Sequence, residues 1–366
     1  MAGLAAIVGA AAGAGGGDSD EAQPAASAVP PQCAGSGADA ARSMAGQRLV
    51  VRTDAAPDRK LLARAGAGQI AGVIVFPGTD QGEPAVRQGV ERLQEAAAQG
   101  GEPPLIVATD QEGGGVKRFL EAPPQRAPAQ LAEFGDPGDS RLEGKATANF
   151  LTRIGINVDL APVLDVPSTP DSVIALRAFG DDPAQVSELG LAFADGLANG
   201  GALATAKHFP GIGRSTLNTD FSPSAIDASR RELAGDLKPF EEAIAQDVPL
   251  IMVGLAAYPG LGSKEPAALS PEIAQGLLRD RLGFEGVSIT DDLQAGAVAS
   301  TLSSPRAAVA AAAAGDDLLL FAQDSAPGVL DPLAHAISTG RVDVEAARAA
   351  CTRVVGMRES LPGEAG

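Results

Sequence analysis

Residues 105–114 read Leu-Ile-Val-Ala-Thr-Asp-Gln-Glu-Gly-Gly, a short apolar run that passes directly into polar residues and glycines. Runs of this kind, rich in β-branched residues and bounded by turn formers, are typical of buried strands. Segments with the apolar spacing of helices separate one run from the next. Eight such runs lie between about residues 47 and 355, at residues 48–51, 72–76, 105–109, 157–160, 202–206, 249–253, 287–290 and 317–321.

This alternation of strands and helices predicts an α/β fold with a parallel sheet. Helix start signals support the assignment, since Asp182 precedes Pro183, and Val186, Leu189 and Phe193 then follow on one helical face. Eight strand–helix units in a single domain favour a closed, TIM-like (β/α)8 barrel. A doubly wound open sheet is the alternative that the same alternation allows.

The composition argues against several classes of function. The 366-residue chain has 28 Lys and Arg against 46 Asp and Glu, a net charge of -18, so it should repel nucleic acid and anionic lipids. Two His and two Cys cannot form a zinc site of recognisable spacing, and we expect no metal and no cofactor, although carboxylates alone could hold an ion. After residue 40 no run reaches the roughly 18 apolar residues of a transmembrane segment.

The two ends of the chain differ from its middle. Residues 1–40 are rich in Ala, Gly, Pro and Ser and contain no Lys or Arg. We expect a flexible leader or signal remnant there, a barrel over residues 41–358 and a tail over residues 359–366. Residues 4–17 weakly resemble the apolar core of a secretory signal, although no basic residue precedes them.

Cys33 and Cys351 stand near the two ends of the expected fold. They could form a disulfide if these ends meet, or they could be two unrelated thiols. A disulfide would support export to an oxidising compartment.

Polar residues follow four of the predicted strands, at the end where a barrel gathers its chemistry. They include Asp110 after the third run, Asp159 and Asp165 after the fourth, Lys207 with His208 after the fifth, and Asp291 with Asp292 after the seventh. Carboxylates in this arrangement suit glycoside hydrolysis, in which one attacks the anomeric carbon and a second group protonates the leaving oxygen. Asp291 is the candidate nucleophile because a rigid apolar strand precedes it, and Asp292 should point elsewhere.

Lys207 allows a second chemistry, because a lysine at a strand end can form a Schiff base with a carbonyl substrate. Under that hypothesis the carboxylates at the strand ends would have no common function. A sugar site explains more residues, since Asp110, Arg118 and His208 can also hydrogen-bond hydroxyl groups. The glycines at 113–115 lack the Lys-Ser/Thr of a phosphate-binding loop, and we expect a loop with unusual backbone angles.

Several segments resemble glycoside hydrolase family 3, specifically its single-domain bacterial β-N-acetylhexosaminidases. They occur in the family's order over roughly residues 44–355, at residues 72–76, 110–118, 155–165, 177–180, 207–211 and 277–293. The resemblance implies a TIM-like barrel that removes terminal β-linked N-acetylglucosamine with retention, from a muropeptide-like or chitin-like glycan. We expect a secreted or cell-envelope protein of bacterial type, without a cofactor, that is a monomer.

The resemblance also assigns roles to single residues. Asp291 matches the family's nucleophile. The positions that match sugar-binding residues are Asp110, Arg118, Arg177, Lys207 and His208. His208 could instead only orient its loop.

The acid/base segment departs from the family's pattern. Where those hexosaminidases carry Asp-Ser-His, this chain has Asn218, Thr219 and Asp220, so Asn218 replaces the orienting Asp and Asp220 the catalytic His. If Asp220 is the general acid/base, it must be protonated when the leaving group departs, which favours activity at low pH and hydrolysis over phosphorolysis. If Asp220 is only a solvated loop residue, the chain is a weak or inactive relative that binds envelope glycans.

Overall fold

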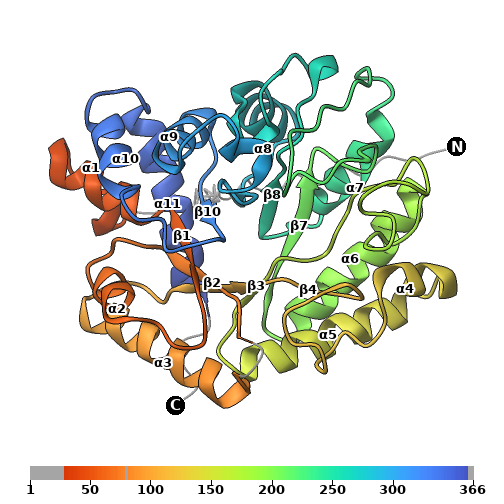
Figure 1. The fold of residues 1–366 in the computed structure, drawn as a ribbon, viewed down its shortest axis with the longest axis horizontal. Coiled ribbons are helices and arrows are strands. Elements are labelled where there is room, and N and C mark those ends of the chain that lie inside the picture. Colours follow the sequence, from red (N-terminus) through yellow and green to blue (C-terminus); the bar gives the residue numbers. More distant parts are fainter. Residues whose placement is uncertain (1–28, 79–80, 362–366) are drawn as a thin grey trace, which may run out of the picture.

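A computed structural model describes residues 29–78 and 81–361. Its central sheet has eight parallel strands in the order β10-β1-β2-β3-β6-β7-β8-β9. The sheet closes on itself, because the backbone N–H of Leu318 donates to Ser288 and the N–H of Thr290 donates to Leu318, which joins β9 to β10. The fold is therefore a TIM-like (β/α)8 barrel within a single domain, as predicted, and the open sheet is wrong (Figure 1).

All eight predicted strands are present with slightly shifted ends. The barrel strands are β1 (Leu49–Thr53), β2 (Gly72–Val75), β3 (Ile106–Thr109), β6 (Val158–Asp159), β7 (Leu203–Phe209), β8 (Leu250–Val253), β9 (Val287–Thr290) and β10 (Leu319–Phe321). The main difference is that β7 continues through Lys207 and His208, which the sequence placed after the strand.

A short antiparallel pair follows β3 and was not predicted. It consists of β4 (Gln111–Gly113) and β5 (Val116–Lys117). Gly113 and Gly114 have φ angles of 104° and 58°, in the left-handed region that favours glycine, so the expectation of unusual backbone angles is confirmed. The pair turns the chain back over the end of the barrel.

Helices surround the strands in Figure 1. They are α1 (Gly37–Gly46), α2 (Arg59–Gly66), α3 (Glu83–Gln99), α4 (Pro128–Phe134), α5 (Pro137–Arg153), α6 (Pro183–Asn199), α7 (Ala234–Ala245), α8 (Gly296–Ala299), α9 (Ser304–Ala314), α10 (Leu330–Ser338) and α11 (Val344–Ser360), with the short or irregular helices η1 (Pro31–Cys33), η2 (Pro259–Leu261), η3 (Ala267–Leu269) and η4 (Glu272–Arg281). The carboxylate of Asp182 caps α6 by accepting the N–H of Gln185 at 3.1 Å, as the sequence predicted.

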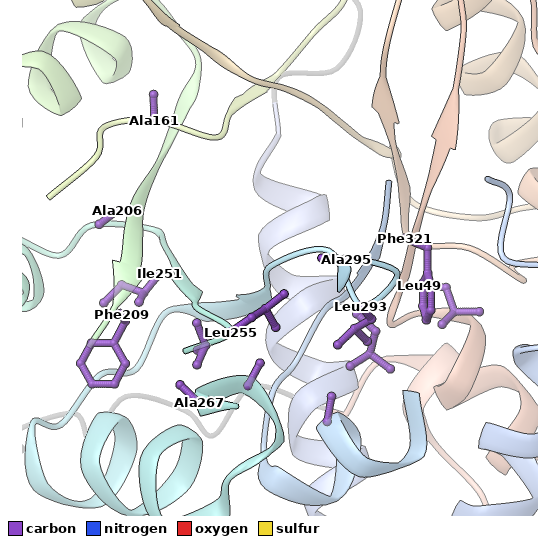
Figure 2. Packing of buried hydrophobic residues seen from close by; sticks show 14 of the residues in the cluster. Leu49, Ala161, Ala206, Phe209, Ile251, Leu255, Ala267, Leu293, Ala295 and Phe321 are labelled. Atoms are coloured by element: carbon purple, nitrogen blue, oxygen red, sulfur yellow. The ribbon is translucent and has the colours of Figure 1, made fainter. Parts of the chain in front are cut away.

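Alternate residues of the strands fill two separate cores. Val50, Ile106 and Leu250 belong to the cluster inside the barrel. Leu49 and Phe321, which Figure 2 shows, belong to the cluster between the strands and the helices. Because aliphatic side chains fill the interior, chemistry is confined to the ends of the barrel.

Helix α11 closes the amino-terminal end of the barrel. Val354 of this helix and Leu361 after it join the interior cluster. Arg358 donates hydrogen bonds to the carbonyls of Pro103 and Pro104, which precede β3. The amino-terminal end is thus occupied by packing, whereas the carboxyl-terminal ends of the strands carry the loops with polar residues.

The domain boundaries stay a prediction, and the described helices and buried residues extend a few residues beyond the expected barrel at both ends. Helices η1 and α1 occupy residues that were assigned to the leader, and Leu361 of the predicted tail is buried. The reason is that an alanine-rich segment forms a helix readily when it can pack, and α1 packs against α10. Residues 1–28, which include residues 4–17, and residues 362–366 lie outside the described residues. Within the described ranges, none of the helices has the length and apolar character that crossing a membrane requires.

A disulfide joins Cys33 in η1 to Cys351 in α11, with the Cα atoms 5.7 Å apart. The alternative of two unrelated thiols is therefore wrong. Both cysteines of the chain are used in this bond.

Candidate functional site

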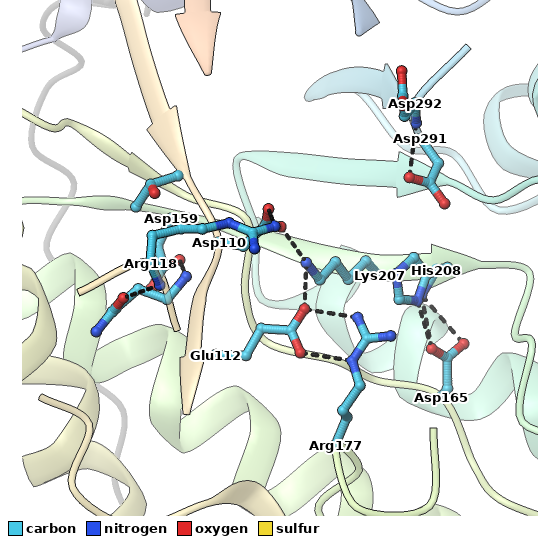
Figure 3. Close-up of polar contacts among 12 residues, drawn as sticks. Asp110, Glu112, Arg118, Asp159, Asp165, Arg177, Lys207, His208, Asp291 and Asp292 are labelled. Carbon is cyan, nitrogen blue, oxygen red and sulfur yellow. Dashed lines mark hydrogen bonds and ion pairs between the residues drawn. The ribbon is translucent and has the colours of Figure 1, made fainter. Parts of the chain in front are cut away.

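A cluster of charged residues occupies the carboxyl-terminal end of the barrel (Figure 3). Lys207 is at its centre, with Nζ 3.0 Å from Asp110 Oδ1 and 2.6 Å from Glu112 Oε1. Arg118 Nη2 donates to Asp110 Oδ2 at 2.8 Å, and Arg177 donates two hydrogen bonds to Glu112 at 2.8 and 2.7 Å. The structure thus brings together four of the five predicted sugar-binding residues, around Glu112, for which no role was predicted.

Burial and pairing together set the charges of this cluster. Burial alone would raise the pKa of both carboxyls, but Lys207 and the arginines hold that of Asp110 far below its usual range and lower that of Glu112 to about 2. Burial alone would lower the pKa of Lys207, but Glu112 and Asp110 outweigh it and raise this pKa. Lys207 is therefore protonated and has no free electron pair, so the Schiff-base hypothesis is disfavoured.

His208, the fifth predicted residue, is next to Lys207 on β7 and is held by Asp165. Its Nδ1 lies 2.7 Å from Asp165 Oδ2. The backbone N–H groups of His208 and Ile212 also donate to Asp165, at 3.2 and 2.7 Å. Because a carboxylate only accepts, Nδ1 carries the proton and Nε2 is left as the acceptor of the ring.

Asp291 follows β9, and Figure 3 shows its carboxylate directed toward His208. Its backbone N–H donates to the carbonyl of Val253 at 2.9 Å, which fixes it to the end of β8. Burial raises the pKa of Asp291 and the negative charge of Asp220 adds to the increase, while His208 and Lys207 act in the opposite direction. The candidate nucleophile therefore lies at the same end of the barrel as the predicted sugar-binding residues.

Asp292 points elsewhere, as its strand position predicted. Its Oδ1 accepts the N–H groups of Gln294 and Ala322 at 3.0 and 2.9 Å, and its Oδ2 accepts from Gln323 Nε2 at 3.2 Å. These contacts tie the end of β9 to the end of β10. Asp292 is thus a support for the segment that carries Asp291.

Asp220 is exposed on the loop between β7 and α7. Its backbone N–H donates to Asn218 Oδ1 at 2.8 Å, and its carbonyl accepts the N–H of Gly296 in α8 at 2.8 Å. The side chain of Asn218 therefore shapes a turn and does not bind the carboxylate of Asp220. The backbone of this loop is anchored, yet the charge of Asp220 is close enough to act on the pKa of Asp291.

Three buried acids of the site had no assigned role at the sequence level. Glu112 and Asp165 bind Arg177 and His208, and Asp159 accepts a backbone N–H beneath the cluster. Asp159 ends β6 and Glu112 lies two residues from Asp110, whereas Asp165 lies six residues beyond β6 and has neither signal. In the part of the chain that the structure describes, no group of three His, Cys, Asp or Glu could hold a metal ion.

The chain is similar in sequence to known proteins. The Glycosyl hydrolase family 3 N terminal domain matches residues 45–357. The chain is 33% identical over 315 residues to an uncharacterized secreted glycosyl hydrolase of Arthroderma benhamiae, which covers 83% of this chain and 89% of that protein. It is 34% identical over 281 residues to the beta-hexosaminidase LpqI of Mycobacterium tuberculosis, which covers 74% of this chain and 72% of LpqI.

Two solved structures have a similar fold. A beta-N-acetylhexosaminidase from Beutenbergia cavernae matches with a TM-score of 0.79 and 30% identity, over 87% of this chain and 98% of that one. A family 3 beta-N-acetylglucosaminidase from Paenibacillus matches with a TM-score of 0.83 and 29% identity, over 88% of this chain. The chain spans 63% of the length of the Paenibacillus protein.

Proposed function

Since this chain belongs to glycoside hydrolase family 3 and is a glycosidase of O-glycosyl bonds, we propose that it removes terminal β-linked N-acetylglucosamine from glycans. The observation that carries the proposal is that Asp291 follows β9 with its carboxylate directed toward His208, at the barrel end that also holds the charged cluster (Figure 3). The relatives named beta-hexosaminidase support the choice of sugar.

In the proposed reaction, a carboxylate oxygen of Asp291 attacks the anomeric carbon and forms a covalent glycosyl–enzyme. Asp220 gives its proton to the departing oxygen, and the aglycone leaves as an alcohol. Asp220 then takes a proton from water, which attacks the same carbon and releases the sugar with its configuration retained.

The charges around Asp291 suit its role as the nucleophile. Burial raises the pKa of Asp291, whereas the positive charge of Lys207 favours the ionised carboxylate, which is the form that attacks. In this proposal Asp220 must be protonated when the leaving group departs, which favours activity at low pH.

The charged cluster is proposed to hold the sugar. The side chain of Arg118 is 32% exposed and that of Asp110 14%, whereas those of Lys207 and Glu112 are 2% and 1% exposed. Arg118 and Asp110 can therefore reach the sugar hydroxyls directly. Lys207 and Glu112 lie behind them and hold them in place, and Arg177, 24% exposed, extends the cluster at its edge.

A glycan-binding protein with little or no turnover is the second candidate. It is favoured by the exposure of Asp220 and by the use of the Asn218 side chain within its own turn, because neither feature forms an acid/base dyad. Asp110, Arg118 and His208 would bind the sugar in either case.

We also propose a secreted or envelope location. The disulfide between Cys33 and Cys351 supports an oxidising compartment, and one relative is named as secreted. The monomeric state remains a prediction, which light scattering of the purified protein would test.

Hydrolysis of 4-nitrophenyl β-N-acetylglucosaminide between pH 4 and 8 tests the function, with the corresponding β-glucoside as control. We expect faster turnover of the N-acetyl substrate, and proton NMR should detect the β-anomer as the first product. An α-anomer would contradict the retaining mechanism. No turnover, together with binding of N-acetylglucosamine in calorimetry, would establish the second candidate.

A further inference from the structure

Asp159 lies at the end of β6, fully buried beneath the charged cluster, and the proposed reaction does not use it. Its Oδ1 accepts the backbone N–H of Gln111 at 3.0 Å. Its Oδ2 is buried without a hydrogen-bond partner among the described residues. An ionised carboxylate with one oxygen left unsatisfied in such a place is costly, so the environment favours the neutral acid.

Gln111, whose backbone N–H donates to Asp159, contacts several residues of the site. Gln111 stands between Asp110 and Glu112, so its backbone sets the direction of both carboxylates. Its side-chain Oε1 accepts the backbone N–H of Arg118 at 3.0 Å and that of Phe119 at 3.1 Å. The hydrogen bond that Asp159 accepts therefore fixes the backbone that carries Asp110 and Glu112, and through the Gln111 side chain it also supports Arg118.

We propose that neutral Asp159 is a positioning residue for the sugar-binding cluster, and that its ionisation in alkaline solution weakens sugar binding by drawing Lys207 away from Asp110 and Glu112. The identification of the cluster as a sugar site rests on the proposed function. The coupling of Asp159 to Gln111 and Lys207 does not rest on the proposed function.

The charges that face Asp159 come from the strands on either side. Asp159 pairs with Thr109 of β3 and Ala204 of β7 in the barrel. Burial raises the pKa of Asp159 to about 8, and Asp110 and Glu112 contribute to the increase, while the N–H of Gln111 and the charge of Lys207 oppose it. The arginines of the cluster are already bound to the other two carboxylates.

Ionisation of Asp159 changes the number of carboxylates that compete for the ammonium group of Lys207. Below about pH 8, Lys207 faces two carboxylates, which it bridges at 3.0 and 2.6 Å. Above that pH a third carboxylate competes for the same ammonium group. Because the bridge holds Asp110 where a sugar hydroxyl would meet it, the loss should appear in substrate affinity.

The test compares the wild type with Asp159→Asn and Asp159→Ala, by KM for 4-nitrophenyl β-N-acetylglucosaminide and by calorimetric binding of N-acetylglucosamine between pH 6 and 9.5. The wild-type KM should rise about tenfold from pH 7 to pH 9, since about one tenth of a group with a pKa of 8 is still protonated at pH 9. Asp159→Asn keeps the acceptor oxygen and cannot ionise, so its KM should not vary over this range. Asp159→Ala should bind weakly at every pH.

Asp316→Asn is the matched control, because Asp316 is also buried and its carboxylate oxygens have no hydrogen-bond partner among the described residues, but it precedes β10 at the opposite end of the barrel. This variant should keep the wild-type alkaline rise in KM. The same alkaline rise in Asp159→Asn would overturn the proposal.

Carbon-13 NMR of aspartate carboxyl groups gives a readout that does not depend on activity. A resonance that titrates near pH 8 in the wild type and is missing from Asp159→Asn would support the proposal. Burial also raises the pKa of Asp316 well above its usual range, so if Asp159→Asn does not fold the titration is read in Asp316→Asn, where the absence of any carboxyl titrating above about pH 6 overturns the proposal. If no substrate is turned over, the proposed hydrolysis fails, while NMR and sugar binding still test Asp159.

Discussion

Lys207 Nζ lies 2.6 Å from Glu112 Oε1, and the side chains of both residues are almost completely buried. The desolvation of two buried charges offsets much of their attraction, so the pair adds little net stability, but the removal of one partner leaves the other charge uncompensated. Glu112 also accepts two hydrogen bonds from Arg177. It is thus the carboxylate that joins β7 to the loop carrying Arg177.

Glu112→Gln should be less stable than the wild type at pH 7, and this difference should shrink as the pH falls. The pKa of Glu112 is lowered from 4.5 to about 2, so its ionised form contributes stability that is present above about pH 4.5 and is lost as the pH falls toward 2. The shift corresponds to roughly 3 kcal/mol. Urea unfolding at pH 7, 4.5 and 3 measures it, with the exposed Glu133→Gln as control. A difference that does not change with pH would contradict the prediction.

Asp291→Asn should lower kcat by more than about 10³-fold, because the amide cannot attack the anomeric carbon. The folded state and the binding of N-acetylglucosamine should be preserved, which calorimetry checks. In the wild type, the raised pKa of Asp291 places the acid-side loss of kcat/KM above pH 3.8, since only the ionised form attacks. Asp292→Asn, which removes a support of the same segment, should lose stability and keep more activity. Equal activities of the two variants would argue against Asp291 as the nucleophile.

Asp220→Ala should lose about 10²- to 10⁴-fold in kcat on a substrate with a poor leaving group, and much less on the 4-nitrophenyl glycoside. The reason is that 4-nitrophenolate departs without a proton. The exposed Asp227→Ala, in the same segment between β7 and α7, serves as control and should be unaffected. Equal losses on both substrates would show that Asp220 acts otherwise than as a proton donor.

The variant Cys33→Ser/Cys351→Ser should be roughly 2–5 kcal/mol less stable than the oxidised wild type. The bond closes a separation of 318 residues, so its removal restores much freedom to the unfolded chain. Guanidinium unfolding with and without reductant measures the difference. Reductant should destabilise the wild type alone, and a reductant effect on the double variant would point to another cause.

The barrel could be predicted from the sequence because buried parallel strands leave an uninterrupted apolar signal. The runs at 105–109 and 249–253 are of this kind, and they became β3 and β8. The end of β7 could not be predicted in the same way, since Lys207 and His208 are polar residues within a strand. They are tolerated there because Glu112 and Asp165 neutralise or satisfy them.

The charged cluster was predicted only in part. The identities of Asp110 and Arg118 suggested hydroxyl binding, but the sequence does not reveal which carboxylate meets which cation. Glu112 belongs to the cluster because it lies in the β4–β5 pair, which contacts Lys207 of β7. This pair was not predicted. The contact between Asn218 Oδ1 and the N–H of Asp220 could not be predicted from the sequence either, because it depends on the turn that the loop adopts.

The bond between η1 and α11 also decides how the protein responds to force. A pull on chain segments outside Cys33 and Cys351 passes through the disulfide, so the 318-residue separation between them bears no tension. At about 3.5 Å per extended residue, the disulfide prevents the extension of roughly 1,100 Å of chain. A molecule tethered at either end would keep its barrel, and with it the site, intact under shear for as long as the bond stays oxidised.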